Sequence, residues 1–232
     1  GPSERRRFLD MMIGQIRPNY INNLNTYNKI LEQRNNYLKQ IKDGNVNYDL
    51  LDIWDEKLAA YANKICLYRN EFINKIKEKI SNIHNDITNN SEKIEIEYVT
   101  DCLNKEKLLE LIKSRRKLDI IKGYTTKGTH RDDFNIYIND NLVNVFGSQG
   151  QHRTAVLSLK VCELQIIKEE TGESPILLLD DFMSELDSKR RKNFLNKIED
   201  TQVIITCTDK FAENKENNAV FYVEKGKIEK EQ

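Results

Sequence analysis

Proline, glycine and cysteine are scarce in this sequence. Only 3 prolines and 9 glycines occur among its 232 residues, which favours long regular elements over loops. The 4 cysteines lie far apart and form no C-x-x-C pair. This spacing argues against a zinc site and against a disulfide framework, so we expect reduced thiols and a cytoplasmic protein.

The sequence also has no excess of either charge sign and no long apolar run. Its 37 Lys and Arg residues balance 37 Asp and Glu residues, which argues against a uniformly basic nucleic-acid binder but leaves local patches open. No apolar stretch reaches the roughly 18 residues that a membrane helix needs, and no signal peptide is recognisable. We therefore expect a globular protein without membrane contact, with one large domain or two small ones.

Two apolar stripes at helical spacing occupy the first half of the sequence. The first stripe comprises Tyr20, Leu24, Tyr27, Leu31, Leu38 and Ile41. The second runs from Trp54 to Ile87 and predicts a helix over about 49–88, which would be roughly 60 Å long. The two stripes predict an antiparallel helix pair whose aromatic and aliphatic side chains form a core rather than a ligand site.

The pattern then changes towards alternating strands and helices. We expect a half-exposed strand at 94–99, a helix over 103–121 and a β-meander or hairpin over 124–146. A helix over 150–170 precedes two short apolar runs, at 176–179 and 203–205, which predict parallel strands buried on both faces. A helix at 188–198 lies between these runs, and a small hairpin ends the sequence. This order predicts an α/β fold with a parallel sheet.

Two adjacent carboxylates, Asp180 and Asp181, follow the apolar run at 176–179. The carboxyl ends of strands are where α/β proteins bind ligands. Neighbouring carboxylates repel each other unless a cation relieves them, and Mg²⁺ shared with phosphates is suited to this. The alternative is that one aspartate caps the next segment.

Two weaker motifs flank helices. Ser184-Glu185-Leu186-Asp187 precedes a basic helix, where Ser, Asp and Glu are also ordinary N-cap residues. Gly147-Ser148-Gln149-Gly150-Gln151 precedes the helix over 150–170. Its glycines and the N–H groups of the helix start could hold a phosphate, although a plain strand-to-helix loop has the same composition.

Taken in order, these motifs resemble the RecF family of DNA repair and recombination proteins, which belongs with the ABC- and SMC-type ATPases. The resembling segments are Arg5–Asp10, His130–Asp133, Phe146–Thr154, Leu157–Lys160 and Leu177–Asp181. The resemblance implies the C-terminal half of a P-loop ATPase head with a mostly α-helical lobe inserted. It divides the sequence into a segment leading in from the ATPase domain (1–15), the lobe (16–122), a β-meander (123–146) and the rest of the ATPase domain (147–232).

The resemblance also implies roles for individual residues. The signature motif, which contacts the γ-phosphate of ATP held by the other subunit of a dimer, falls on Ser148, Gln149 and Gly150, with Gln151 beside them. Asp180 falls on the Walker B aspartate that orients Mg²⁺ through water, and Asp181 on the general base or water-positioning group. Asp187 falls on the D-loop aspartate at the dimer interface. Thr208 falls roughly on a switch position where many ABC ATPases have histidine.

The phosphate-binding loop of such ATPases is not found. No G-x-x-x-x-G-K-[ST] occurs, and the only Gly-Lys pair, Gly226-Lys227, is followed by isoleucine. We therefore expect the sequence to match about the last two thirds of the family protein. We also expect it to be inactive alone, because that loop cradles the phosphates. The complete protein would be a slow ATPase that uses ATP and Mg²⁺.

The implied partners are DNA with a gap or junction, RecR, RecO and a second copy of the protein in an ATP-dependent homodimer. Residues 4–42 carry eight Lys and Arg and three acids, and eight minus three leaves a charge of +5. The DNA-binding candidates in this patch are Arg5, Arg6, Arg7 and Arg17. A solvated helix face with intramolecular ion pairs explains the patch equally well.

Two other functions remain open from the sequence. The helical half could be a protein-interaction module without ATP dependence. Alternatively, Asp180, Asp181 and Glu185 could form a Mg²⁺-dependent phosphodiesterase, which would cleave its substrate without any nucleotide.

Overall fold

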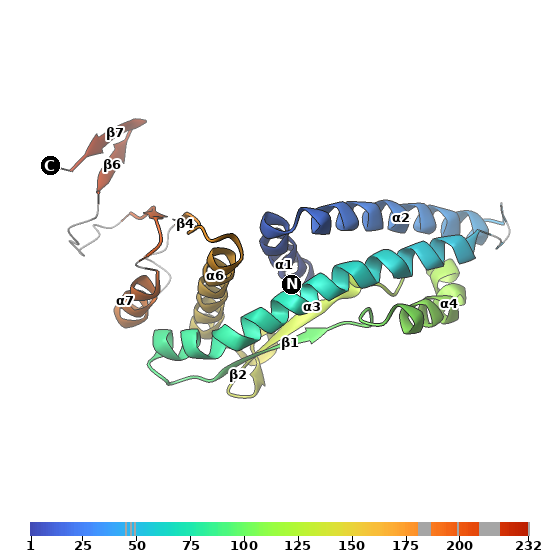
Figure 1. The fold of residues 1–232 in the computed structure, drawn as a ribbon, viewed down its shortest axis with the longest axis horizontal. Coiled ribbons are helices and arrows are strands. Elements are labelled where there is room, and N and C mark those ends of the chain that lie inside the picture. The colour runs from blue at the N-terminus through green and yellow to red at the C-terminus, as the bar shows by residue number, and fades with distance from the viewer. Residues whose placement is uncertain are drawn as a thin grey trace.

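Two long helices lie side by side along much of the molecule (Figure 1). The structure is a computed structural model that describes residues 1–44, 46, 48, 50–180, 187–198, 200–208 and 219–231. Helix α1 (Pro2–Ile16) is followed by α2 (Pro18–Lys42), which begins with proline at its first position, and by α3 (Leu51–Thr88). Tyr20, Tyr27 and Leu38 of α2 are buried against α3. The predicted antiparallel helix pair is therefore confirmed.

A three-stranded antiparallel sheet follows, in the order β1-β2-β3. Its strands are β1 (Ile94–Val99), β2 (Asp133–Ile138) and β3 (Asn141–Leu142). Helix α4 (Lys105–Lys122) and the 3₁₀ turn η1 (Thr129–Arg131) connect β1 to β2, and α4 packs on α3. We refer to α2, α3 and α4 as the helical lobe.

The expected meander over 124–146 is only partly right. Residues 129–131 form η1, and the strand expected beyond Leu142 is instead the helical turn α5 (Val143–Phe146). Val143 is buried while Val145 and Phe146 are exposed, so this stretch does not alternate as a paired strand would.

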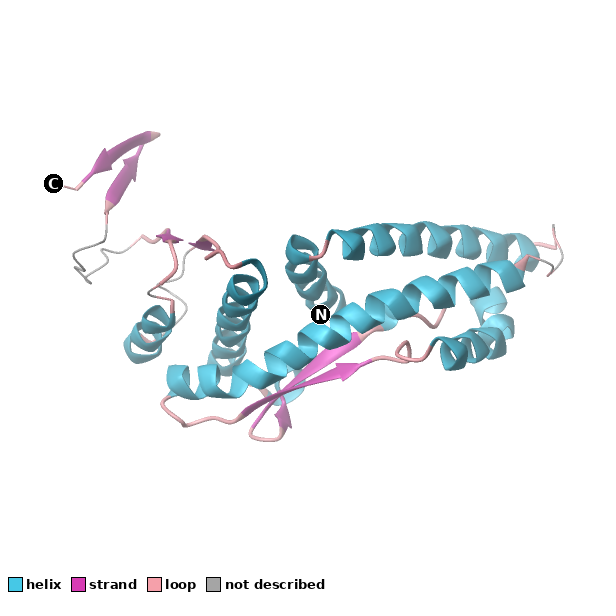
Figure 2. Cartoon of the chain, in the orientation of Figure 1, coloured by secondary structure: helices cyan, strands magenta, loops and turns pink. Residues whose placement is uncertain are grey.

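The last third of the chain combines helices with short strands. Helix α6 (Gln149–Thr171) packs on α3, and β4 (Leu177–Leu179) pairs in parallel with β5 (Val203–Ile205). Helix α7 (Ser188–Lys197) lies between these strands in the sequence. A hairpin of β6 (Phe221–Glu224) and β7 (Lys227–Lys230) follows (Figure 2).

The expectation that β4 and β5 are covered on both faces is wrong for the chain as it stands. Leu177 is buried, but Leu178 and Ile204 are 69% and 52% exposed. One face of the two strands therefore packs on the core, and the other presents aliphatic side chains to solvent.

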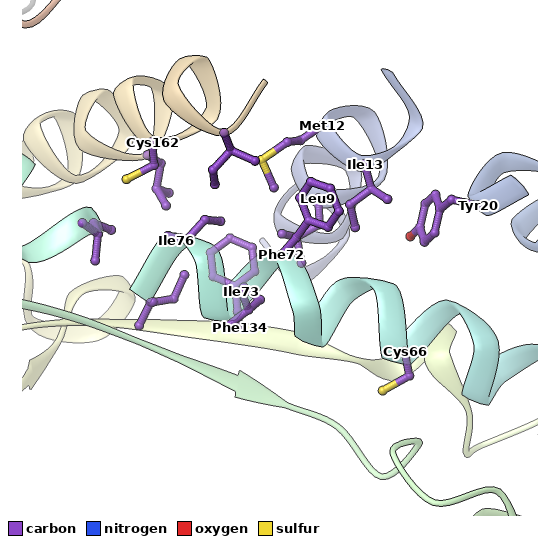
Figure 3. Close-up of a cluster of buried hydrophobic side chains, with 14 of the residues drawn as sticks. Leu9, Met12, Ile13, Tyr20, Cys66, Phe72, Ile73, Ile76, Phe134 and Cys162 are labelled. Carbon is purple, nitrogen blue, oxygen red and sulfur yellow. The ribbon is translucent and has the colours of Figure 1, made fainter. Parts of the chain in front are cut away.

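The larger of the two hydrophobic clusters among the described residues contains residues from α1 to α7, and Figure 3 shows part of it. Leu9 and Met12 of α1, Phe72 and Ile76 of α3, and Cys162 of α6 all belong to it. Residues of this cluster lie on both sides of the domain boundaries that we predicted at 15/16, 122/123 and 146/147. The domain boundaries stay predictions. No helix in the described ranges combines the length and the apolar character that crossing a bilayer requires.

Candidate functional site

The turn over residues 147–151, here called the signature turn, begins helix α6 with a reciprocal cap. The Ser148 hydroxyl accepts a hydrogen bond from the backbone N–H of Gln151 (3.2 Å), and the Gln151 side-chain oxygen accepts one from the Ser148 N–H (2.9 Å). A Cβ on Gly147 would overlap the carbonyl oxygen of Val143. Ser148 and Gln149 are exposed. The backbone of the turn is thus fixed, while two of its side chains face solvent.

Asp187 lies at the start of α7, beside the signature turn. Its carboxylate accepts hydrogen bonds from the N–H groups of Lys189 (3.1 Å) and Arg190 (2.9 Å), so it caps the helix. The side chain of Arg190 in turn donates to the hydroxyl of Thr154 on α6 (3.0 Å). The predicted signature residues and the predicted D-loop aspartate are therefore brought to one end of α6.

Asp180 belongs to a second group at the carboxyl ends of β4 and β5. The Thr206 hydroxyl donates to the Asp180 carboxylate, and the Thr206 N–H donates to the Leu179 carbonyl (2.9 Å). Thr208 lies two residues further on and is exposed. We call Asp180, Thr206 and Thr208 the strand-end group. Asp181, the predicted general base, lies outside the described residues, as does Glu185.

The strand-end group offers oxygen ligands to a hard cation. Among the residues that the structure describes, no cluster of three or more His, Cys, Asp or Glu could hold a metal ion. Magnesium does not need such a cluster, because it commonly binds through one or two carboxylates together with phosphates and water. The exposed carboxylate of Asp180 therefore fits Mg²⁺ that is shared with a nucleotide.

The two groups are separated along the chain by α6. This helix has 23 residues and is about 34 Å long. The signature turn precedes it, and β4 follows its other end (Figure 1). Asp180 comes directly after β4. The sequence-predicted residues are thus arranged as two groups rather than as one pocket.

Three of the four arginines proposed for DNA binding have intramolecular partners. Arg5 makes two hydrogen bonds to the Asp133 carboxylate (2.7 and 2.6 Å). Burial acts to raise the pKa of Asp133, but the hydrogen bonds from Arg5 and from the Phe134 N–H, together with the positive charges of Arg5 and Arg6, outweigh it and the pKa is lowered. Arg6 donates to the Asp132 carbonyl (2.8 Å), and Arg17 pairs with Glu170. Arg7 is exposed. The ion-pair explanation of the basic patch therefore holds for Arg5 and Arg17.

A buried arginine that the sequence analysis missed, Arg69 on α3, joins two of the RecF-like segments. Its guanidinium contacts the carboxylates of Asp10 (2.9 Å) and Asp132 (3.2 Å). Asp132 also accepts hydrogen bonds from Tyr98 (2.8 Å) and Thr100 (2.6 Å). Arg69 stands between Ile65 and Phe72 in the apolar stripe of α3, and a charge in such a stripe is the signal that could have revealed it. Together with the Arg5–Asp133 pair, these contacts clamp segment Arg5–Asp10 to segment His130–Asp133.

The comparisons with known proteins agree with the motifs. No model of a protein family matches the sequence. The DNA replication and repair protein RecF of Clostridium perfringens strain SM101 is 43% identical over 235 residues, which cover 98% of this chain and 64% of that protein. RecF of Ruminiclostridium cellulolyticum is 44% identical over 220 residues, covering 90% of this chain and 59% of that protein. The chain belongs to the RecF family. It spans about 60 to 65% of the length of the curated RecF proteins it matches.

Solved RecF structures agree with this assignment at the level of the fold. The structure described as the recombination mediator protein RecF-ATP in the RecFOR pathway has a TM-score of 0.87 and 42% identity, over 100% of this chain and 64% of that one. A second RecF structure, described as RecF-ATPrS, gives the same TM-score and identity. The predicted RecF-type α/β fold with its large helical part is confirmed.

Proposed function

We propose that this chain is part of a RecF-type DNA-repair ATPase and supplies the half of the nucleotide site that acts across a dimer. The observation that carries the proposal is the exposed signature turn, with Asp187 fixed beside it and Asp180 in a separate group. The separation of the signature turn from Asp180 suits a dimer with two nucleotide sites, each of which is shared between the two copies. The solved relative described as RecF-ATP supports ATP as the ligand.

At such a site the residues of this chain would have distinct tasks. Ser148 and the N–H groups at the start of α6 would hold the γ-phosphate of a nucleotide on the second copy, aided by the positive end of the helix dipole. Asp180 would hold Mg²⁺, and Asp181 would orient the attacking water or accept its proton. Bound Mg²⁺ supplies charge neutralisation at the phosphates.

The uncovered face of β4 and β5 supports the same proposal. Leu178 and Ile204 expose aliphatic side chains on two short paired strands, an arrangement that sheets normally cover or extend. The RecF relatives have more than a third of their length outside the matched region. We assign this face to packing against that further part of a complete RecF protein, which would also bring the phosphate-binding loop.

DNA, RecO and RecR are the proposed partners of the complete protein. The relatives are named replication and repair proteins, and the solved structures are described as belonging to the RecFOR pathway. Because Arg5 and Arg17 are engaged within the chain, Arg7 is the first candidate among the four arginines for contact with a DNA phosphate.

The decisive experiment measures Mg·ATP binding, hydrolysis and dimerisation of the complete protein. We expect Asp181→Asn to bind ATP and dimerise but to turn over at least about 100-fold more slowly, since it removes the group that handles the water. Ser148→Arg should instead weaken dimerisation, because a bulky side chain would stand where the second copy's nucleotide docks. The 232-residue chain alone should hydrolyse ATP negligibly.

The same experiment separates the alternatives. Strand cleavage without nucleotide would favour the phosphodiesterase function. A complete protein with neither ATP nor metal dependence would favour the interaction module. Normal hydrolysis by Asp181→Asn would refute the assignment of the base.

A further inference from the structure

Arg190 on α7 is the point where three separate segments meet. Its Nη1 donates to the Thr154 hydroxyl on α6 (3.0 Å), and its Nη2 lies 3.4 Å from Glu92 Oε1 in the segment between α3 and β1. Its Nε lies 3.6 Å from Asp187, at the N-cap of its own helix. The side chain is only 24% exposed. The guanidinium, whose N–H donors have a fixed geometry, thus links α6, the segment between α3 and β1, and Asp187 at the predicted D-loop position.

The same side chain supports the backbone of the signature turn. A Cβ on Gly150 would lie 3.3 Å from Arg190 Nη1, so the guanidinium fills the space next to this glycine. Thr154, which accepts from Arg190, donates its own hydroxyl to the Gly150 carbonyl (2.8 Å). A shift of Arg190 would therefore displace the first turn of α6.

On its other side, Arg190 holds Glu92, and a buried histidine of α3 lies next to this carboxylate. Ser158 donates its hydroxyl to the Thr154 carbonyl (2.9 Å), so its oxygen accepts from His84 Nδ1 (2.9 Å). With the proton on Nδ1, the unprotonated Nε2 of His84 lies 3.3 Å from Glu92 Oε2 and makes no hydrogen bond to it. Burial lowers the pKa of His84, and Glu92 only partly opposes this. His84 is thus bonded to α6 through Ser158, whereas Glu92 is held by Arg190 through its other oxygen.

Helix α7 is also fastened directly to the end of α3. The Asn193 side chain donates to the Ile87 carbonyl (3.2 Å), and Lys197 forms an ion pair with Asp86. Phe194 of α7 is fully buried in the common core. Because α3 has 38 residues and runs through the helical lobe, α7 packs on the same continuous helix as the other helices of the lobe do.

We propose that Arg190 is a positioning residue that couples three elements: the Asp187 cap, the signature turn and, through Glu92, the segment at the end of helix α3. Docking of a second copy's nucleotide at the signature turn would then change the position of the helical lobe. This inference rests on the proposed ATPase function for its trigger, but the mechanical link itself is a property of the chain without nucleotide. It makes Arg190 a residue that acts through others and does not touch the nucleotide.

The test uses the complete protein with Arg190→Ala, Arg190→Lys and a matched control, Lys192→Ala, which removes an exposed cation from the same helix. The first readout is amide hydrogen exchange without nucleotide. We expect Arg190→Ala to accelerate exchange about 10-fold or more both in the first turn of α6 and at the end of α3. Lys should restore the effect only in part, because an ammonium cannot span three partners. Glu92→Gln should accelerate exchange at the end of α3 while leaving the first turn of α6 close to wild type.

The second readout is kinetic. Arg190→Ala should lower kcat and weaken dimerisation by about 10-fold, within the usual range of coupling between sites, while KM for ATP changes little. Equal exchange and equal kinetics in Arg190→Ala and Lys192→Ala would overturn the proposal. A wild-type protein that neither binds ATP nor dimerises would overturn the proposed function instead, and the exchange readout would still decide whether Arg190 links α6 to α3.

Discussion

Replacing Arg34 by alanine should be among the most destabilising single changes in the helical lobe. Arg34 on α2 is fully buried, and its guanidinium donates to Asp55 on α3 (2.7 Å) and to Asp119 on α4 (2.8 Å). It also donates to the Thr125 hydroxyl (2.7 Å). One side chain thus joins all three helices of the lobe and the segment after them.

The size of this loss of stability follows from which partners the carboxylates of Asp55 and Asp119 keep after the change. Asp55 retains the guanidinium of Arg116 (2.6 Å), but Asp119 retains, among the described residues, only the N–H and the hydroxyl of Thr126 (3.0 and 2.6 Å). Asp119 would be left as a buried charge without a cation, and breaking a buried pair in this way costs about 3–5 kcal/mol. A slope typical of urea unfolding converts this loss into a midpoint shift of roughly 1–2 M.

Urea unfolding of the 232-residue chain, followed by circular dichroism, measures this shift. Arg115→Ala, which removes an exposed arginine from α4, is the control and should move the midpoint little. The double variant Arg34→Met with Asp119→Asn should recover part of the loss, since it removes the uncompensated charge and fills the space. A double variant that is less stable than Arg34→Ala would refute the reasoning, because then the orphaned carboxylate is not the source of the cost.

Two further predictions concern the loop before β2. Gly128 has φ of +135°, and a Cβ there would overlap the Tyr27 hydroxyl, so Gly128→Ala should cost at least about 2 kcal/mol. Gly172 lies in the milder αL region (φ +74°, ψ 0°) without any neighbour within 4 Å, so Gly172→Ala should cost less, and a larger loss at Gly172 in the same urea assay would contradict the prediction. Burial lowers the pKa of His130 from 6.5 to about 4. In the fold, the Tyr27 hydroxyl and the Thr125 carbonyl hold the neutral ring. As the pH falls, the unfolded chain takes up this proton before the folded chain does. The stability that the neutral ring contributes should therefore be fully present above pH 6.5 and fall by about 3 kcal/mol as the pH drops to 4. His130→Gln should flatten this part of the pH profile, and an unchanged slope would show that other groups cause it.

The long helices could be predicted because one physical signal dominates them. The stripe from Trp54 to Ile87 keeps a helical period over many turns, and α3 (Leu51–Thr88) matches the predicted range 49–88 closely. A charged side chain within such a stripe signals a buried charge but does not identify its partners. Arg34 and Arg69 stand on the buried faces of α2 and α3, and only the fold shows the aspartates that neutralise them, which come from distant segments.

The predictions for the short elements were wrong for a related reason. The apolar run 176–179 predicted a strand covered on both sides, yet Leu178 is exposed, because the cover of a sheet is supplied by other segments and not by the strand. At 143–146 an alternating pattern predicted a strand, whereas the chain forms a helical turn. Four residues are too few to distinguish the period of a strand from that of a helix.

The candidate site shows the same division between local and long-range information. Ser148 with Gln151 and Asp187 with its helix are local motifs. The helix cap that the sequence offered as the alternative at 184–187 forms at Asp187, whereas the cap between Ser148 and Gln151 was not predicted. The contact between these motifs depends on Arg190, which the sequence presents as one of four consecutive cations, Lys189 to Lys192. Arg190 directs its guanidinium to Thr154 on α6 and to Glu92 beyond α3. A helix can direct only some of its residues towards a given neighbour, so the run of cations is divided by geometry between the interior and the solvent. The motif therefore indicates where charge lies, whereas the packing of α7 on α3 and α6 selects the residue that joins the signature turn to the helical lobe.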